Sequence, residues 1–189
     1  GPVDKRSLTF TSEPLVHDLL VSGAVSAHLS ASSSAVDTDW VVHLCDVFPD
    51  GRSLNVVEGI QRARFRESAS APSLLQPGHI YDYTVRMSAT EYLFRAGHRL
   101  RITVGSSSYP RWSRNLNVAA FPEQAVEWTV ARNAIHVDAA HPSWVELPIL
   151  SADAVACRHG KDAAPSGERG ALPMEAMPCP KPGGSEYPR

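Results

Sequence analysis

Residues 39–53 read DWVVHLCDVFPDGRS, a stretch that combines a strand pattern with a turn. Within residues 39–48, apolar side chains occupy both alternating sets of positions, which indicates a β-strand buried on much of both faces. Pro49, Asp50 and Gly51 follow, and they predict a turn because the glycine accepts a positive φ at little cost. The stretch therefore predicts a strand that ends in a turn and leads into the next strand.

The same period-two alternation recurs through the first 150 residues. Further strands are predicted at residues 21–30, 53–58, 60–66, 79–87, 98–106 and 143–150. Residues 123–133 are interpreted as a strand rather than a helix, because Trp128-Thr129-Val130 is a β-favouring run. About eight short strands separated by turn residues are typical of an all-β sandwich or jelly roll.

Composition changes near residue 151, where the aliphatic alternation stops. Residues 152–189 contain six prolines and five glycines, and Tyr187 is their single aromatic residue. Such a segment buries too little apolar area to offset the entropy of ordering it. We expect one domain over residues 1–150 and a disordered Pro/Gly-rich tail over residues 151–189, with a docking peptide around residues 174–179 as the less favoured alternative.

Charge and composition exclude several classes of function. The 189 residues include 18 Lys plus Arg and 20 Asp plus Glu, and the resulting net charge of −2 argues against an electrostatic nucleic-acid binder. No apolar run approaches the roughly 20 residues that a membrane span needs, and residues 1–10 lack the apolar core of a signal peptide. The three cysteines are widely spaced and form no C-x-x-C pair, so we expect a cytoplasmic protein without a disulfide framework.

Motifs for nucleophilic catalysis are weak. Residues 105–109 read GSSSY, which places Tyr109 where a G-x-S-x-G nucleophile elbow needs its second glycine. An independent enzyme that uses a serine of residues 106–108 with His98 is therefore a minor hypothesis. We predict no catalytic residue in this chain.

Cofactor and metal motifs are also lacking. The sequence contains no P-loop, no G-x-G-x-x-G and no H-E-x-x-H. His136, Asp138 and His141 have a spacing that metal ligands can adopt, but no fourth ligand is identifiable, and a polar loop before the last strand is the favoured interpretation. We therefore predict no cofactor and no metal.

One group of charged residues predicts an ion-pair network. Arg62, Arg64 and Arg66 share one face if residues 60–66 form a strand, and Asp37 and Asp39 lie shortly before them. Carboxylates that meet these guanidinium groups form charge-assisted bonds. A structural network of Asp37, Asp39, Arg62 and Arg64 is favoured over a site for an anionic ligand.

A second group of residues predicts an interface or ligand loop. Tyr109, Arg111, Trp112, Arg114 and Asn115 cluster between two predicted strands. Large aromatic residues and arginine are common at interface hot spots, and the same aromatic residues stack on sugars. A packing or interface role is favoured over a ligand role.

Four stretches together resemble one known family. They are SSSAVDTDWVVHLCDVFPDGRS (32–53), GIQRARFRES (59–68), PGHIYDYTVRMSATEYLFRAGHRLRITVGSSSYPRWSRNLN (77–117) and HPSWVELPIL (141–150). This combination resembles the C-terminal domain of the Xaa-Pro dipeptidyl-peptidase and cocaine-esterase-like hydrolases. The loop HVDAAHPS (136–143) and residues 116–118 depart from the usual family pattern.

The resemblance implies a non-catalytic β domain with a jelly-roll or galactose-binding-like fold. Whole enzymes of the family carry a Ser-Asp-His triad in a separate α/β-hydrolase domain, and no member of that triad maps onto this sequence. The β domain is implied to pack on the hydrolase domain and to help wall its active-site cleft. The family domain begins tens of residues earlier, so we expect an N-terminally truncated sandwich that depends on a hydrolase domain or subunit, or forms a homo-oligomer. A stand-alone jelly-roll module that binds carbohydrate or another small ligand is the alternative.

Overall fold

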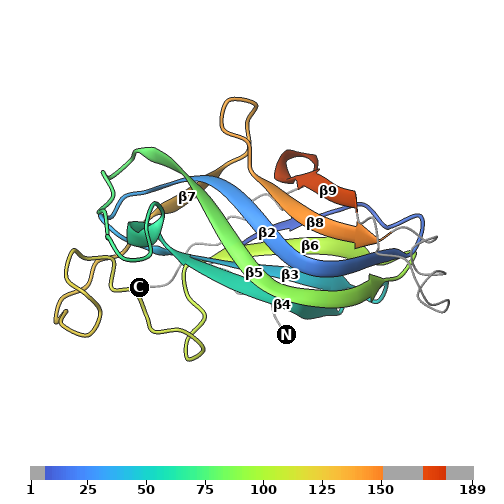
Figure 1. Ribbon diagram of the computed structural model, residues 1–189, viewed down its shortest axis with the longest axis horizontal. Helices are drawn as coiled ribbons and strands as arrows, with labels where there is room; N and C mark the ends of the chain where they lie inside the picture. The colour runs from blue at the N-terminus through green and yellow to red at the C-terminus, as the bar shows by residue number, and fades with distance from the viewer. Residues whose placement is uncertain (1–6, 151–167, 178–189) are drawn as a thin grey trace, which may run out of the picture.

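The computed structural model describes residues 7–150 and 168–177. Within these residues the regular elements are β-strands and two short 3₁₀ turns (Figure 1). The strands are β1 (Leu8–Thr11), β2 (Leu19–Ser33), β3 (Asp39–Val47), β4 (Ser53–Arg62), β5 (Ile80–Phe94), β6 (Arg99–Gly105), β7 (Asn133–His136), β8 (Trp144–Leu150) and β9 (Glu168–Pro173). The 3₁₀ turns are η1 (Ala63–Phe65) and η2 (Met174–Ala176). The prediction of an all-β sandwich is confirmed.

The strands are antiparallel and follow the order β1-β6-β3-β4-β5-β2-β8-β9, with β7 paired to β2. β4 and β5 meet where Gly59 pairs with Met87, and the sheet bends around this junction into two layers (Figure 1). A Cβ atom at Gly59 would overlap the carbonyl oxygen of Arg86, so the close approach of the two strands requires glycine.

The core lies between the two layers and draws on both. β2 contributes Val25 and Leu29, and β3 contributes Leu44, all fully buried. Trp40 on β3 packs against Tyr83 on β5 with ring centroids 5.5 Å apart. As residues 39–48 predicted, most side chains of β3 on both faces are buried. Trp40, Val42 and Leu44 belong to the core, and Val41, Cys45 and Val47 on the other face are buried as well.

The structure corrects the division of residues 53–66 into two strands. β4 runs without interruption through Gly59, which pairs with Val42 of β3, and it ends at Arg62. Residues 63–65 then form the 3₁₀ turn η1, so Arg64 and Arg66 do not continue the strand. Gly59 remains within the strand because it pairs with Val42 of β3 on one side and with Met87 of β5 on the other.

Residues 123–133 do not form the predicted strand. The chain turns at residues 122–124 and then runs in irregular conformation to β7, which begins at Asn133. The β propensity of Trp128-Thr129-Val130 has no effect because no neighbouring strand pairs with this segment over its length.

The predicted tail contains an ordered segment. Residues 151–167 and 178–189 lie outside the described residues, but residues 168–173 form β9, which pairs with β8. Met174 and Met177 follow β9 and are buried in the core. The expectation of disorder is therefore wrong for residues 168–177. The backbone of residues 168–173 pairs with the edge strand β8, and the side chains of Leu172, Met174 and Met177 pack in or against the core.

Candidate functional site

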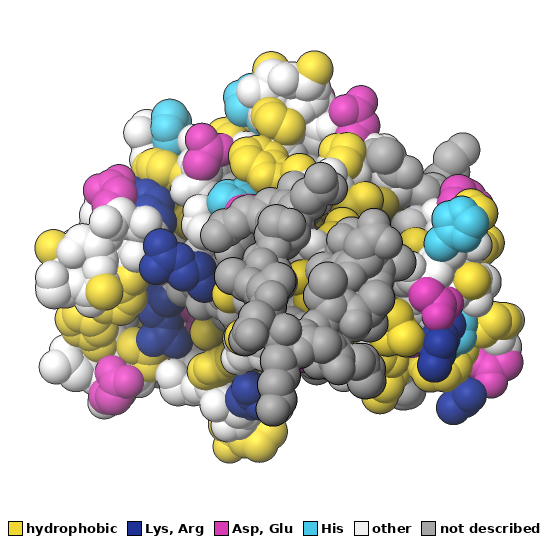
Figure 2. All heavy atoms as spheres, turned by 45° about the vertical axis from the view of Figure 1, so that its right-hand side comes forward, with side chains coloured by type: hydrophobic (Ala, Val, Ile, Leu, Met, Phe, Trp, Pro, Cys, Tyr) yellow, Lys and Arg dark blue, Asp and Glu magenta, His cyan; other side chains and the backbone are white. Residues whose placement is uncertain are grey.

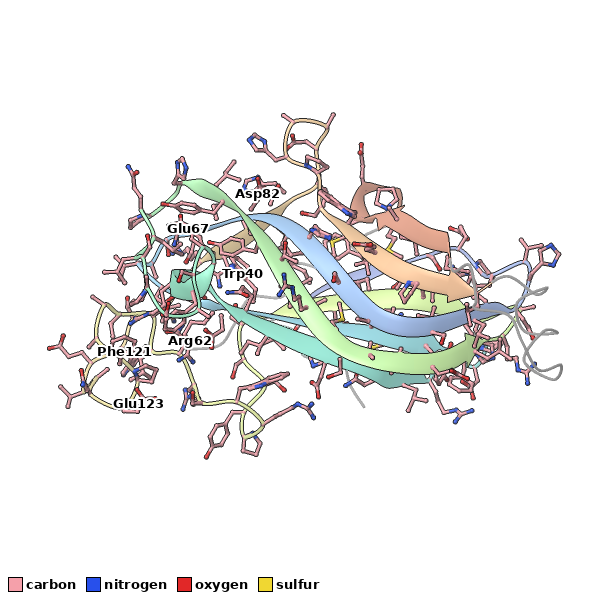
Figure 3. The ribbon with its side chains drawn as sticks, viewed as in Figure 1. Trp40, Arg62, Glu67, Asp82, Phe121 and Glu123 are labelled. Carbon is pink, nitrogen blue, oxygen red and sulfur yellow. The ribbon has the colours of Figure 1, made fainter. Side chains whose placement is uncertain are left out.

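A long segment, residues 106–132, connects β6 to β7 at one end of the sandwich, where Figure 1 shows it in yellow and gold. All five residues of the predicted interface or ligand loop lie in it. Figure 3 shows Arg62, Trp40 and Phe121 at this same end. We call residues 106–132 the end loop.

Asp37 and Arg64 form a buried ion pair beneath the end loop. Arg64 Nε donates to Asp37 Oδ2 at 2.7 Å, and the Arg64 backbone N–H donates to Oδ1 of the same carboxylate at 3.0 Å. Both side chains are almost completely inaccessible to solvent. The other guanidinium nitrogens donate to the carbonyl oxygens of residues 118, 119 and 120 at 2.7–3.3 Å, so this pair holds the end loop on the sandwich.

A second pair lies beside the first. Arg62 donates to Asp39 through Nε at 2.9 Å and through Nη2 at 3.1 Å, and this hydrogen bonding raises the pKa of the Arg62 guanidinium above its usual value. Asn115 Nδ2 lies 2.9 Å from both Asp37 Oδ2 and Asp39 Oδ1 and links the two carboxylates. The predicted charged residues thus come together, and Asn115 of the end loop joins them.

The other arginines of the two predicted groups lie elsewhere. Arg66 does not meet either aspartate: it donates to the Ser73 carbonyl oxygen at 2.6 Å and lies over the Tyr81 ring. Its departure follows from the end of β4 at Arg62, since the predicted common strand face does not exist beyond that residue. Arg111 pairs with Glu58 at 3.0 Å and lies over the ring of Trp112.

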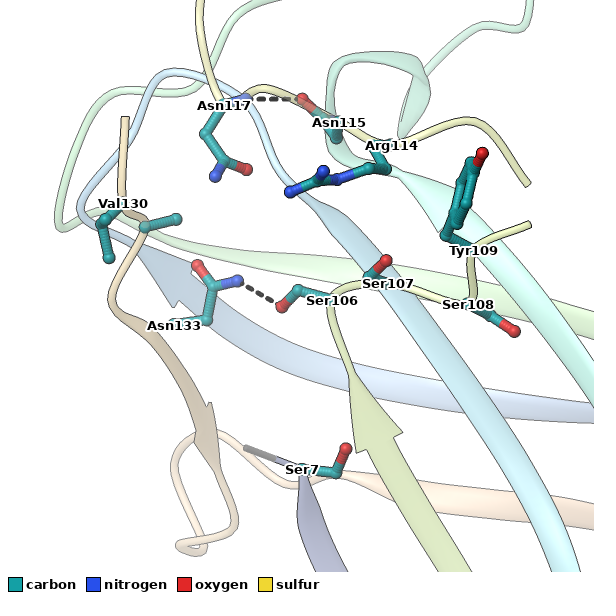
Figure 4. A pocket seen from close by; sticks show the side chains of 11 residues that line it. Ser7, Ser106, Ser107, Ser108, Tyr109, Arg114, Asn115, Asn117, Val130 and Asn133 are labelled. Carbon is teal, nitrogen blue, oxygen red and sulfur yellow. Dashed lines mark hydrogen bonds between the residues drawn. The ribbon is translucent and has the colours of Figure 1, made fainter. Parts of the chain in front are cut away.

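A groove of about 720 Å³ opens between the end loop and the end of β6 (Figure 4). Of the five predicted loop residues, Tyr109, Arg114 and Asn115 line this groove, whereas Arg111 and Trp112 do not. The complete lining is Ser7, Ser106, Ser107, Ser108, Tyr109, Arg114, Asn115, Asn117, Val130, Ala131 and Asn133. Sequence reasoning missed Asn133, because it belongs to β7 and approaches the groove only through the pairing of β7 with β2.

The residues of the minor catalytic hypothesis do not meet. His98 and Ser106 flank the seven residues of β6 at opposite ends, roughly 26 Å apart at the usual rise of a strand. His98 Nδ1 instead lies 2.9 Å from Asp46 Oδ1, and Ser106 Oγ accepts a hydrogen bond from Asn133 Nδ2 at 2.7 Å. The activation of a serine by a histidine, which nucleophilic catalysis needs, is therefore not assembled from these residues.

The remaining chemistry-bearing residues have structural contacts. His136 Nε2 lies 3.1 Å from Ser32 Oγ, whereas Asp138 accepts backbone hydrogen bonds from Ala140 and His141. Among residues 7–150 and 168–177, no three His, Cys, Asp or Glu residues are grouped so that they could hold a metal ion. Burial raises the pKa of the Cys45 thiol, so a smaller fraction of this cysteine is in the nucleophilic thiolate form at neutral pH. In the same described ranges, no helix has the length and hydropathy of a membrane span.

Residues 2–146 match the family of the X-Pro dipeptidyl-peptidase C-terminal non-catalytic domain. The chain belongs to this family. The resemblance seen in the four sequence stretches is thus confirmed. Cocaine esterase from Rhodococcus sp. (strain MB1 Bresler) is 42% identical over 159 residues, which cover 79% of the chain and 28% of that esterase.

Two solved structures support the same assignment. An α-amino acid ester hydrolase is 33% identical with a TM-score of 0.73, and the match covers 76% of this chain and 25% of that protein. An aminopeptidase from the marine sediment archaeon Thaumarchaeota archaeon is 30% identical with a TM-score of 0.71, and the match covers 77% of this chain and 26% of that protein. This non-catalytic domain therefore spans about a quarter of the length of these relatives.

Proposed function

We propose that this chain is the C-terminal β domain of a serine hydrolase with esterase or peptidase activity, and that it packs on the α/β-hydrolase domain and helps wall the active-site cleft. The observation that carries the proposal is the family match over residues 2–146, to a domain described as non-catalytic. The relatives named esterase, ester hydrolase and aminopeptidase are about four times as long as the matched region, which leaves room for a separate catalytic domain.

The contacts of the end loop support a scaffold role. Its two ends continue β6 and β7, and its middle is fixed by hydrogen bonds from Arg64, Arg62 and Asn115. A 27-residue connection held in one conformation by buried charges can present a defined surface to a neighbouring domain. His98 and the serines of residues 106–108 lie apart, which agrees with a triad located in another domain.

A domain exchange in cocaine esterase tests the proposal. The hydrolase part of that esterase is produced alone and also fused to this chain in place of its own matching region. We expect this chain alone to hydrolyse nitrophenyl esters and Xaa-Pro nitroanilides only at the background rate, and the fusion to be more stable and more active on esters than the hydrolase part alone. A folded fusion with no gain over the hydrolase part would contradict the proposal, as would turnover by this chain that a serine-directed phosphonate abolishes.

A further inference from the structure

Among the described residues, the groove beside the end loop carries one positive charge without a counter-charge. Arg114 is the one described lining residue that is charged at neutral pH, and no carboxylate of residues 7–150 or 168–177 lines the groove. Within the part of the chain that the structure describes, the Arg114 guanidinium has no ion-pair or hydrogen-bond partner, and Figure 4 shows its side chain extended across the groove.

The nearby acids do not supply the missing counter-charge. Asp37 accepts hydrogen bonds from the Nε and backbone N–H of Arg64, and Asp39 accepts two from Arg62. Asn115 Nδ2 occupies a further acceptor position on each carboxylate. Their negative charge is therefore balanced within the network, and Arg114 is left available for a ligand.

Hydroxyl groups on the opposite wall can complete an oxyanion site. Ser106 Oγ accepts a hydrogen bond from Asn133 Nδ2 at 2.7 Å, so its own hydrogen is free to donate elsewhere. The hydroxyls of Ser107 and Ser108 have no hydrogen-bond partner among the described residues, and both line the groove. In Figure 4 the Ser107 hydroxyl points toward the side of the groove on which Arg114 lies, whereas the Ser108 hydroxyl points away from it. The groove thus combines one guanidinium with two hydroxyl donors, those of Ser106 and Ser107.

Hydrogen bonds within the end loop hold the walls of the groove. Asn117 adopts a φ of 62°, its backbone N–H donates to Asn115 Oδ1 at 2.8 Å, and its side chain donates to the Thr129 carbonyl oxygen at 2.8 Å. The Thr129 backbone N–H in turn donates to the Leu116 carbonyl oxygen at 3.0 Å. These bonds fix the two sides of the end loop relative to each other, which lowers the entropy cost of binding.

We propose that this groove binds a carboxylate that carries an apolar body. The single positive charge of Arg114 matches a monoanion, and a guanidinium binds a carboxylate through two parallel hydrogen bonds. A phosphate dianion would need a second cation, and the described residues that line the groove supply none. Val130, Ala131 and the ring of Tyr109 supply apolar surface for the rest of the ligand.

The carboxylate has two possible sources. It is either a free organic acid or an acidic side chain of the hydrolase domain, and the second source rests on the function proposed above. Both sources place the same group against Arg114, so a free acid is the appropriate first probe.

Hexanoate and hexan-1-ol provide a matched pair of probes for the 189-residue chain. We expect hexanoate to shift the amide NMR signals of the groove residues with millimolar affinity, and hexan-1-ol to bind at least ten times more weakly. Arg114→Gln should weaken hexanoate binding by at least tenfold, and Arg114→Lys should weaken it less. Arg86→Gln, which changes an exposed arginine on β5, is the control and should have no effect.

The outcomes test whether the groove binds a carboxylate, and they distinguish the two sources of that carboxylate. Equal binding of hexanoate and the alcohol, or unchanged hexanoate binding in a folded Arg114→Gln variant, would overturn the proposal. If the isolated chain binds hexanoate and the fusion with the esterase hydrolase part does not, the occupant is an acidic side chain of that part. If both bind, the site takes a free acid. A fusion that fails to assemble would count against the proposed function and leave the result on the isolated chain intact.

Discussion

At the scale of single residues, the buried pair of Asp37 and Arg64 determines where the end loop lies. The pair is removed from water, so its Coulomb attraction is offset in large part by the cost of desolvation. Its specific contribution is geometric, because the guanidinium distributes its remaining donors over three consecutive loop carbonyl groups at residues 118–120. The ring of Phe121 covers the same guanidinium, with its centroid 4.9 Å from Arg64 Cζ.

Replacement of Arg64 tests this role. We expect Arg64→Met to lower the free energy of unfolding by about 3–5 kcal/mol, because it leaves the Asp37 carboxylate buried without its counter-charge. The end loop should also become sensitive to limited proteolysis, since three carbonyl groups lose their donor. Urea denaturation and mass spectrometry of the proteolytic fragments measure the two effects.

The exposed pair of Arg52 and Asp50 is the control for this prediction. Its arginine side chain is 72% exposed, so Arg52→Met should change the stability by less than about 1 kcal/mol. An equal loss in the two variants would show that burial of the Asp37–Arg64 pair has no particular importance. Recovery of stability in the double variant Arg64→Met, Asp37→Asn would support the explanation by an unpaired charge.

The residue types of this network were predictable from the sequence, and its full geometry was not. Two aspartates and three arginines at alternating positions indicated ion pairs. The absence of Arg66 from the network depends on the end of β4 at Arg62, which is set by sheet pairing and not by the local alternation of residues. The contribution of Asn115 depends on a loop conformation that no short-range pattern specifies.

At the scale of elements, strands with strong alternation were predicted well and weakly patterned ones were not. β3 and β6 have the predicted positions to within a residue or two because their apolar alternation coincides with burial. β9 was not predicted from the sequence, because the composition of residues 151–189 as a whole is rich in proline and glycine. The six residues of β9 contain a single leucine and show no alternation of apolar and polar side chains. Pairing with β8 supplies the order that the local sequence does not.

The contribution of this last element to the core is testable. Met174 is completely buried, although it lies outside the region that the sequence assigns to the domain. We expect Met174→Ala to lower the free energy of unfolding by about 2–5 kcal/mol, the usual range for removal of a buried methionine side chain. Thermal and urea denaturation measure the loss.

The exposed neighbour Glu175 serves as the matched control. Glu175→Ala should leave the stability nearly unchanged, because its side chain lies in solvent. If Met174→Ala were as mild as Glu175→Ala, residues 168–177 would be peripheral to the fold and would contribute little to its core.

At the scale of the whole molecule, exposed apolar residues are concentrated at the end that carries the end loop. Val126, Trp128 and Val130 are 95%, 70% and 71% exposed, and they occupy alternating positions of one segment. In Figure 2 basic side chains lie toward both ends of the visible face, so charge does not single out one end of the molecule. Three apolar residues with this exposure at alternating positions of one segment are uncommon on a protein that acts alone, and they favour a contact surface.

The function proposed above assigns a partner to this surface. The matched region is about a quarter of each relative, so most of such a protein lies outside the domain described here. On the proposed function, the occupant of the Val126, Trp128 and Val130 surface is the hydrolase domain. A tryptophan at the centre of such a contact commonly contributes about 2 kcal/mol or more to the free energy of association.

Two measurements on one set of variants separate a contact surface from a structural role. The replacement of all three residues by serine should leave the unfolding of the isolated chain within about 0.5 kcal/mol of the original, because the side chains already lie in solvent. The same replacement in the fusion with the esterase hydrolase part should lower its thermal stability, since the apolar contact is lost only there. Val16→Ser removes an 81% exposed apolar side chain elsewhere on the surface and should affect neither protein. A fusion as stable with the three serines as without them would place the contact with the hydrolase domain on another face of the sandwich.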